Sequence, residues 1–326
     1  WAYFWIMGSR GARGCLLIPA CGLSLTAFLA MPEPRRGSPR APMLSFSLLL
    51  LLALTAAVVV WLPWDPDLAS SGPYLYGSYY RSAMERSSSG LGSAVRQRGE
   101  LVFSHEGPDS LVTVRRSAGG LLSLQVNGKT DASTGGDLKT QALTAHLPLL
   151  VHNPEVDTRS RVLIVGLGSG VTAAAALTHP AGQVDVIEIS PGVVAAASLF
   201  KGTTGDLGAD PRMRTIPGDA RAHLLYAQAG SARYDVIASQ PSNPWIAGQA
   251  ILFTREFFAL AADRLAPGGL MCQWLQGQGL PAEDFRSILA TFAGVFPHVS
   301  LWEESTAGGD YLLIGSKDPV RIDERA

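Results

Sequence analysis

The chain has 326 residues, of which 47% are hydrophobic and only 16% are charged, with a formal net charge of −1. That length allows one large domain or two medium ones, with a core that needs no disulfide or metal for stability. The near-neutral charge lacks the basic field of a nucleic-acid-binding protein. The three cysteines (Cys15, Cys21 and Cys272) show neither zinc-site spacing nor a disulfide framework. We therefore expect no nucleic-acid partner and no metal site.

Residues 1–64 are predicted to contain one or two membrane segments. Residues 43–62 form a run of about 20 uncharged residues, the length that crosses a bilayer core, with Trp61 and Trp64 at its end. A buried core helix is the alternative for this run. The apolar run at residues 15–31 is shorter and contains Pro19 and Gly22, which leaves a second crossing open.

The orientation of these segments is ambiguous from the sequence. Three arginines at residues 32–42, between the two apolar runs, favour a cytoplasmic position for this link. A single crossing after the link would then place the rest of the chain outside. Arg10 and Arg13 make the other flank of the first run basic as well, and a chain that begins at Trp1 is a candidate fragment of a longer protein. Our expectation is a membrane protein with a cytoplasmic C-terminal domain.

Residues 65–135 are expected to form a linker and a small β module. Residues 65–99 are rich in Ser, Gly, Pro and Tyr, which indicates irregular structure. Three runs of strand-forming residues at 101–103, 111–114 and 121–126 follow, separated by turn signals, and predict an antiparallel meander.

Residues 136–326 are predicted to form an α/β domain. Apolar runs alternate with helical patterns after a first helix at 138–151. The predicted strands are 161–165, 184–189, 213–216, 234–238, 269–275, 299–302 and 311–315. The predicted helices between them are 171–177, 192–200, 220–228, 253–265 and 284–296. This order predicts a methyltransferase-like (Rossmann-type), doubly wound and mainly parallel sheet.

A glycine-rich loop follows the first strand of this domain. Gly166, Gly168 and Gly170 stand between a buried strand and a helix, where glycine lets the backbone and the helix N–H groups approach a ligand. The third glycine comes one residue earlier than in the dinucleotide-binding pattern. This spacing favours an adenosylmethionine-type pocket over NAD.

Acidic residues end the next two strands. Glu188 lies about 20 residues after the glycine loop, where a carboxylate accepts hydrogen bonds from ribose hydroxyls. Asp219, followed by Ala220, ends the third strand, where a carboxylate can meet an adenine amino group. Because the carboxyl ends of parallel strands share one sheet edge, these residues and the glycines predict one nucleoside pocket.

Residues 124–315 resemble the spermidine synthase (polyamine aminopropyltransferase) family, in particular its membrane-attached branch. The motifs that carry this resemblance are Asn127-Gly128-Lys129, Gly136-Asp137, His146-Leu147-Pro148-Leu149, Gly166 to Gly170, Val186 to Ile189, Gly218 to Arg221 and Pro241 to Trp245. The resemblance implies a small β domain on a methyltransferase-like sheet. It also implies decarboxylated S-adenosylmethionine as donor, an amine as acceptor, methylthioadenosine as product, and no tightly bound cofactor. The ribose-binding acid of the family falls on Glu188 and its adenine-contacting aspartate on Asp219.

The amine half of the site departs from the family. The position of the family's catalytic base is Gln240, and that of its second aspartate is Asn243. An aliphatic amine has a pKa of about 10 and needs a proton acceptor before it can attack, which an amide does not supply. The candidate substrate residues are Asp137, Ser242 and Asn243, and relocated bases are sought at Asp137, Glu303 and Glu304.

Three functions remain open from the sequence. The first is an aminopropyltransferase-like enzyme with an unusual acceptor, and the second is an S-adenosylmethionine-dependent methyltransferase. The third is a non-catalytic nucleoside-binding module of a membrane protein. A small-molecule acceptor, the membrane and a second copy of the chain in a homodimer are the expected partners.

Overall fold

The computed structural model describes residues 65–88, 90–107, 110–152, 156–226, 233–246, 248–304 and 309–320. Within these ranges no helix combines the length and the apolar character needed to cross a membrane. The predicted membrane segments at 15–31 and 43–62 lie outside the described residues.

The segment predicted to be an irregular linker is helical, so that prediction was wrong. It contains α3 (Pro66–Ala69), α4 (Pro73–Ser87) and α5 (Leu91–Arg96). Asp65 caps α3 by accepting from the backbone N–H of Asp67 at 2.9 Å, and prolines open both α3 and α4. A small apolar cluster of Tyr80, Ala83, Ala94 and Val95 holds α4 against α5. This tertiary packing overrides a composition that favours turns.

A four-stranded antiparallel sheet follows, in the order β1-β2-β3-β4. Its strands are β1 (Glu100–Glu106), β2 (Leu111–Arg116), β3 (Leu122–Val126) and β4 (Lys129–Ser133). The predicted meander is confirmed, but β4 was not predicted. Asn127 and Gly128 adopt φ of 50° and 82°, the left-handed pair that joins two strands in a tight hairpin. This hairpin turns β4 back along β3.

The large sheet has seven strands in the order β10-β11-β9-β8-β5-β6-β7, parallel except that β11 runs antiparallel to both of its neighbours. Its strands are β5 (Arg161–Val165), β6 (Gln183–Glu188), β7 (Met213–Pro217), β8 (Tyr234–Ser239), β9 (Leu265–Gln276), β10 (His298–Glu303) and β11 (Asp310–Ser316). The α-helices are α6 (Leu138–Val151), α7 (Val171–Leu177), α8 (Pro191–Ala197), α9 (Lys201–Thr204), α10 (Ala220–Tyr226), α11 (Arg255–Arg264) and α12 (Ala282–Ala293). Short 3-10 turns are η1 (Ser198–Phe200), η2 (Leu207–Ala209) and η3 (Ala250–Phe253). The predicted α/β alternation is confirmed, with bounds shifted by a few residues.

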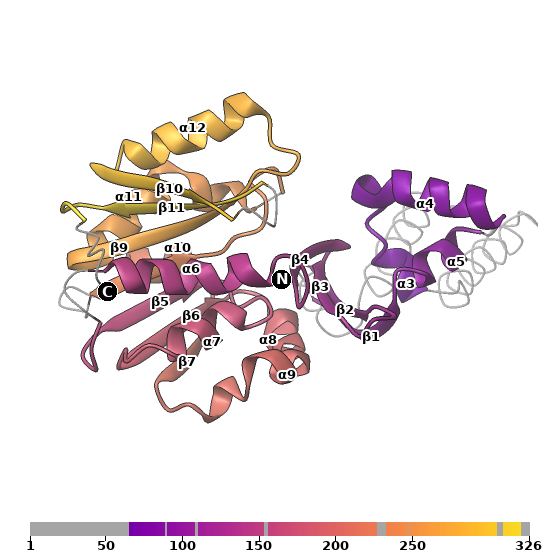
Figure 1. Ribbon diagram of the computed structural model, residues 1–326, viewed down its shortest axis with the longest axis horizontal. Helices are drawn as coiled ribbons and strands as arrows, with labels where there is room; N and C mark the ends of the chain where they lie inside the picture. The colour runs from indigo at the N-terminus through magenta and orange to yellow at the C-terminus, as the bar shows by residue number, and fades with distance from the viewer. Residues whose placement is uncertain are drawn as a thin grey trace, which may run out of the picture.

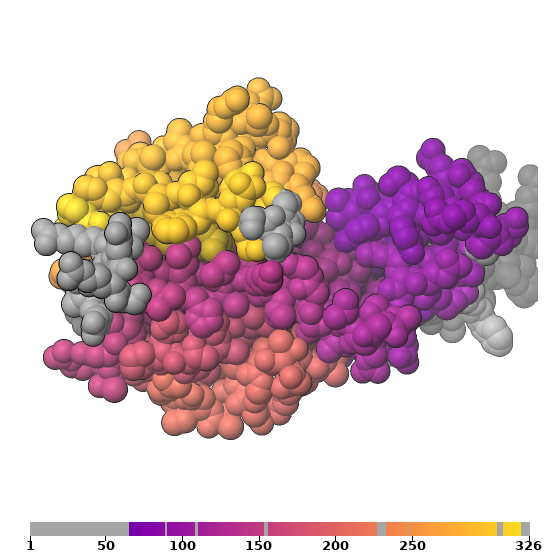
Figure 2. All heavy atoms as spheres, viewed as in Figure 1, coloured from indigo at the N-terminus to yellow at the C-terminus, as the bar shows by residue number. Residues whose placement is uncertain are grey.

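Helices cover both faces of this sheet (Figure 1). Along β5, Val162 and Ile164 join a core with α6, α7 and α8, whereas Leu163 and Val165 join a second core with α10, α11 and α12. Both faces of the strand are therefore buried, which is why its sequence is apolar without alternation. The small sheet packs on the first core, and α3 to α5 project from the α/β body as an indigo lobe (Figure 2).

Candidate functional site

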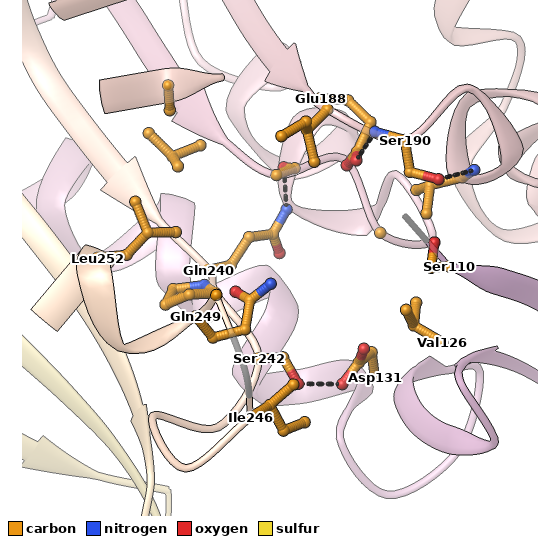
Figure 3. Close-up of a pocket in the computed structure, with 18 of the residues that line it drawn as sticks. Ser110, Val126, Asp131, Glu188, Ser190, Gln240, Ser242, Ile246, Gln249 and Leu252 are labelled. Atoms are coloured by element: carbon orange, nitrogen blue, oxygen red, sulfur yellow. Dashed lines mark hydrogen bonds between the residues drawn. The ribbon is translucent and has the colours of Figure 1, made fainter. Parts of the chain in front are cut away.

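A cavity of about 580 Å³ lies at the carboxyl ends of β5, β6, β7 and β8. The glycine loop, the ends of β6 and β7 and the loop after β8 form its walls, and the small sheet closes it with Leu124, Val126 and Asp131. Figure 3 shows Glu188 and Ser190 on one side and Asp131, Ser242 and Ile246 at the other end. The topology thus brings the predicted nucleoside residues and the polar loop after β8 to one cavity.

The three glycines of the loop have different roles. All have positive φ, at 90°, 55° and 87° for Gly166, Gly168 and Gly170, which explains the residue type. Gly166 and Gly168 line the cavity. Gly170 is not among the lining residues, and a Cβ there would lie 2.7 Å from the Leu207 side chain. Gly170 therefore serves the packing of the helix that follows the loop.

Glu188 ends β6 with its carboxylate in the cavity wall. Its Oε2 accepts from the Leu167 N–H and its Oε1 accepts from the Ser190 N–H, both at 2.8 Å. The residue is 8% exposed, and this burial raises the pKa of its carboxyl although the two N–H donors oppose the shift. The bonds aim the carboxylate across the glycine loop, where ribose hydroxyls could donate to its remaining lone pairs.

Asp219 and Ala220 also line the cavity, at the end of β7. The Asp219 Oδ1 accepts from the Ala222 N–H at 2.6 Å, which fixes the side chain at the start of α10. Three of the predicted nucleoside elements therefore meet in one space. The geometry suits an adenosine whose ribose lies near Glu188 and whose base lies near Asp219.

Gln240 lines the cavity, but its amide is occupied by the protein itself. The Nε2 donates to the Gly166 carbonyl at 2.6 Å, and the Oε1 accepts from the Thr172 hydroxyl at 2.7 Å. A Cβ at Gly166 would lie 3.3 Å from the Gln240 backbone carbonyl oxygen, a tight contact, and the φ of 90° there disfavours any side chain. Gln240 thus braces the glycine loop from the end of β8, and an ionised carboxylate could not donate the bond to the Gly166 carbonyl.

The other predicted substrate residues are placed differently. Ser242 lines the cavity. Asn243 is buried outside the lining and donates to the Gln278 carbonyl at 3.3 Å. Asp137 also lies outside the lining, where its Oδ2 accepts from the Gln141 amide at 3.0 Å. Neither Glu303 nor Glu304 lines the cavity.

Asp131 is a cavity carboxylate that the sequence analysis missed. Its Oδ1 accepts from the Ser242 hydroxyl at 2.6 Å, and the Lys129 Nζ lies 2.5 Å from the same oxygen (Figure 3 shows the serine contact). The available signal was the Asn127-Gly128 hairpin turn. Read as a two-residue hairpin turn, Asn127-Gly128 predicts a strand directly after it, and Asp131 lies on that strand.

The charged side chains that line the cavity are all acidic. They are Asp131, Glu188 and Asp219, and the described lining residues include no lysine, arginine or histidine. The nearest cation among the contacts of these residues is Lys129, which lies behind Asp131 and is not part of the lining. The cavity therefore presents negative charge to a ligand.

The chain is similar to several known proteins. A family model described as the spermine/spermidine synthase domain matches residues 138–303. Putrescine N-methyltransferase 3 of Nicotiana tabacum is 32% identical over 175 residues, which are 53% of this chain and 44% of that protein. A polyamine aminopropyltransferase of Korarchaeum cryptofilum is 27% identical over 54% of this chain and 56% of its own length.

The fold is also similar to solved structures. A spermidine synthase crystallised with the transition-state analogue AdoDATO superposes with a TM-score of 0.60 at 20% identity, covering 67% of this chain and 74% of that one. This chain spans less than half the length of the first curated relative. The matched domain covers half of the chain, including the glycine loop, Glu188 and Asp219, and the chain belongs to the spermine/spermidine synthase family.

Proposed function

We propose that this chain binds decarboxylated S-adenosylmethionine and transfers its aminopropyl group to an amine. In this proposal Glu188 accepts hydrogen bonds from the ribose and Asp219 accepts from the adenine amino group. The loop at Gly166 and Gly168 leaves room for the sulfonium end of the donor.

The acidic lining of the cavity is the observation that carries this proposal. The decarboxylated donor has a sulfonium and an ammonium and no carboxylate. S-Adenosylmethionine itself adds a carboxylate, which would need a cation or free N–H donors when it leaves water. Asp131 is the lining carboxylate that this proposal does not assign to the nucleoside, and the described lining offers no lysine, arginine or histidine to a donor carboxylate. Both features favour the more positive donor.

In the proposed reaction the lone pair of the amine nitrogen attacks the aminopropyl carbon bonded to sulfur. A C–N bond forms, the C–S bond breaks, and its electron pair stays on sulfur in methylthioadenosine. The nitrogen also gives up a proton. Because the Gln240 amide is neutral and tied to the glycine loop, Asp131 is the candidate that attracts the amine and accepts this proton.

Methyl transfer from S-adenosylmethionine to an amine is the second candidate function. It is favoured by the 32% identity to a protein named putrescine N-methyltransferase. The two reactions leave different sulfur products, methylthioadenosine and S-adenosylhomocysteine.

The test incubates the full chain with each donor and a panel of amines and quantifies both sulfur products. Amine-dependent release of methylthioadenosine supports the proposal. Release of S-adenosylhomocysteine instead assigns methyl transfer. Neither product, with methylthioadenosine still bound in a calorimetric titration, would leave a nucleoside-binding module and refute both enzyme functions.

A further inference from the structure

The side chain of Lys129 is buried behind the end of the cavity that Asp131 and Ser242 form. The residue is 7% exposed, unlike most lysines, which keep the ammonium in water. The Nζ lies 2.5 Å from Asp131 Oδ1, 3.2 Å from the Thr130 carbonyl and 3.2 Å from Gln276 Oε1. Three N–H donors therefore meet three oxygens, so this ammonium is fully coordinated by the protein.

The oxygens around Lys129 come from two parts of the fold. Lys129 and Asp131 lie on β4 and their side chains meet, while Gln276 ends β9, next to Trp274 in the cavity wall. Asp131 faces both ways, because the oxygen that contacts the ammonium also accepts from Ser242 at the cavity. The Asp131 carboxylate therefore separates the Lys129 ammonium from the cavity, in which an acceptor amine would lie.

Two further acids near this cluster, Asp310 and Asp137, already accept hydrogen bonds from the protein. Asp310 pairs with Gln276 across β11 and β9, and its Oδ2 accepts from the Thr140 hydroxyl at 3.4 Å. Burial raises the pKa of the Asp310 carboxyl, and Lys129 opposes that shift. Asp137 accepts from the Ser133 N–H at 3.0 Å at the start of α6. Lys129 is thus the described cation that pairs with Asp131, while Asp131 itself still lines the cavity.

The number of ammonium groups in the acceptor decides how it meets this cluster. At neutral pH a diamine carries two ammonium groups, each with a pKa of about 10. An amine with a single nitrogen can use Asp131 and still leave its ion pair with Lys129 intact. A second ammonium would approach the Lys129 ammonium across a low-dielectric wall, where like charges repel strongly.

We propose that the Lys129 ammonium, paired with Asp131 behind the cavity wall, repels the distal ammonium of a diamine, so that the acceptor is an amine with a single positive charge. This proposal rests on the proposed transferase function and names its substrate class. The chain then uses a monoamine, or an amine whose far end is uncharged, in preference to a diamine or longer polyamine.

The test compares n-butylamine with 1,4-diaminobutane, two amines of equal carbon length that differ by one ammonium. Their affinities for the full chain saturated with methylthioadenosine are measured by calorimetry, and their use as acceptors by release of methylthioadenosine from the decarboxylated donor. We expect the wild type to prefer n-butylamine at least tenfold. Lys129→Met, which keeps the length and removes the charge, should raise the affinity for the diamine at least tenfold, whereas Lys129→Arg should keep the wild-type preference.

The possible outcomes separate the two proposals. The proposed acceptor class is wrong if the wild type binds the diamine with the same affinity as n-butylamine. It is also wrong if Lys129→Met folds and leaves the ratio of the two affinities unchanged. Neither result bears on the proposed aminopropyl transfer itself. If methylthioadenosine binds but neither amine binds or reacts, the transferase function fails and the acceptor class fails with it. The wild-type ratio decides the matter even if Lys129→Met does not fold.

Discussion

The brace formed by Gln240 leads to the sharpest prediction for the nucleoside half of the site. Gln240→Glu keeps the length of the side chain and its acceptor for Thr172 but replaces the Nε2 donor with an oxygen. The Gly166 carbonyl, now 2.6 Å from an amide nitrogen, would face a carboxylate instead. Leaving a buried polar group unpaired costs about 1–3 kcal/mol. If this cost destabilises the loop conformation that binds the nucleoside, the affinity for methylthioadenosine drops about 5- to 150-fold.

The assay is calorimetric titration of methylthioadenosine into the wild type and the variant over a range of pH. Acidification protonates the new carboxyl and returns an O–H donor to the Gly166 carbonyl, so the ratio of variant to wild-type affinity should recover as the pH falls. Gln249→Glu is the matched control, because it adds the same charge to the same cavity and leaves the brace in place. Equal affinity of Gln240→Glu and wild type, or equal losses in both variants, would refute the role of Gln240 as a brace.

Three further outcomes are expected. The affinity for methylthioadenosine should fall as the pH drops through the pKa of Glu188, which lies above the usual value of about 4.3, because protonation removes the carboxylate acceptor for ribose. Glu188→Gln should flatten this pH profile in calorimetry. An unchanged profile in the variant contradicts the assignment of Glu188 to ribose. Gly168→Ala should lower the affinity for the nucleoside more than Gly170→Ala does. Gly170→Ala should lower the thermal unfolding midpoint more than Gly168→Ala does, because its new Cβ would lie 2.7 Å from the Leu207 side chain. The opposite ranking of the two variants would contradict the roles given to the two glycines. The Arg115 guanidinium, 2% exposed, lies 2.7 Å from Asp67 Oδ1, and Asp67→Ala removes this carboxylate while the neutral oxygens around Arg115 remain. The variant should be destabilised by about 3 kcal/mol in urea unfolding, and a loss under about 1 kcal/mol would contradict a buried ion pair.

The central strands of the large sheet could be predicted because burial on both faces leaves an apolar run, as in residues Arg161–Val165. The glycine loop was predicted from its three glycines between a strand and a helix, and their positive φ values in the structure explain the residue type. Helices α4 and α5 could not be predicted in this way. Their stability comes from contacts such as Tyr80 with Ala94 and Val95, which the composition of residues 65–99 does not reveal.

The placement of Glu188 and Asp219 at the cavity was predictable, because both lie at or just after the carboxyl ends of parallel strands, which share one edge of the sheet. The role of a residue was not predictable where it depends on the partner. The sequence shows a glutamine at position 240, but its hydrogen bonds to Gly166 and Thr172 join segments about 70 residues apart. The position of Asp131 at the cavity likewise depends on how the hairpin packs on the large sheet.

The charge of the cavity is the most direct test of the account as a whole. The measurement is the affinity of the full chain for decarboxylated S-adenosylmethionine and for S-adenosylmethionine, which differ only by one carboxylate, under identical conditions. An acidic lining without a described cation predicts that the decarboxylated donor binds at least tenfold more tightly. Equal affinities, or tighter binding of S-adenosylmethionine, would contradict the assignment of this cavity to an aminopropyl donor.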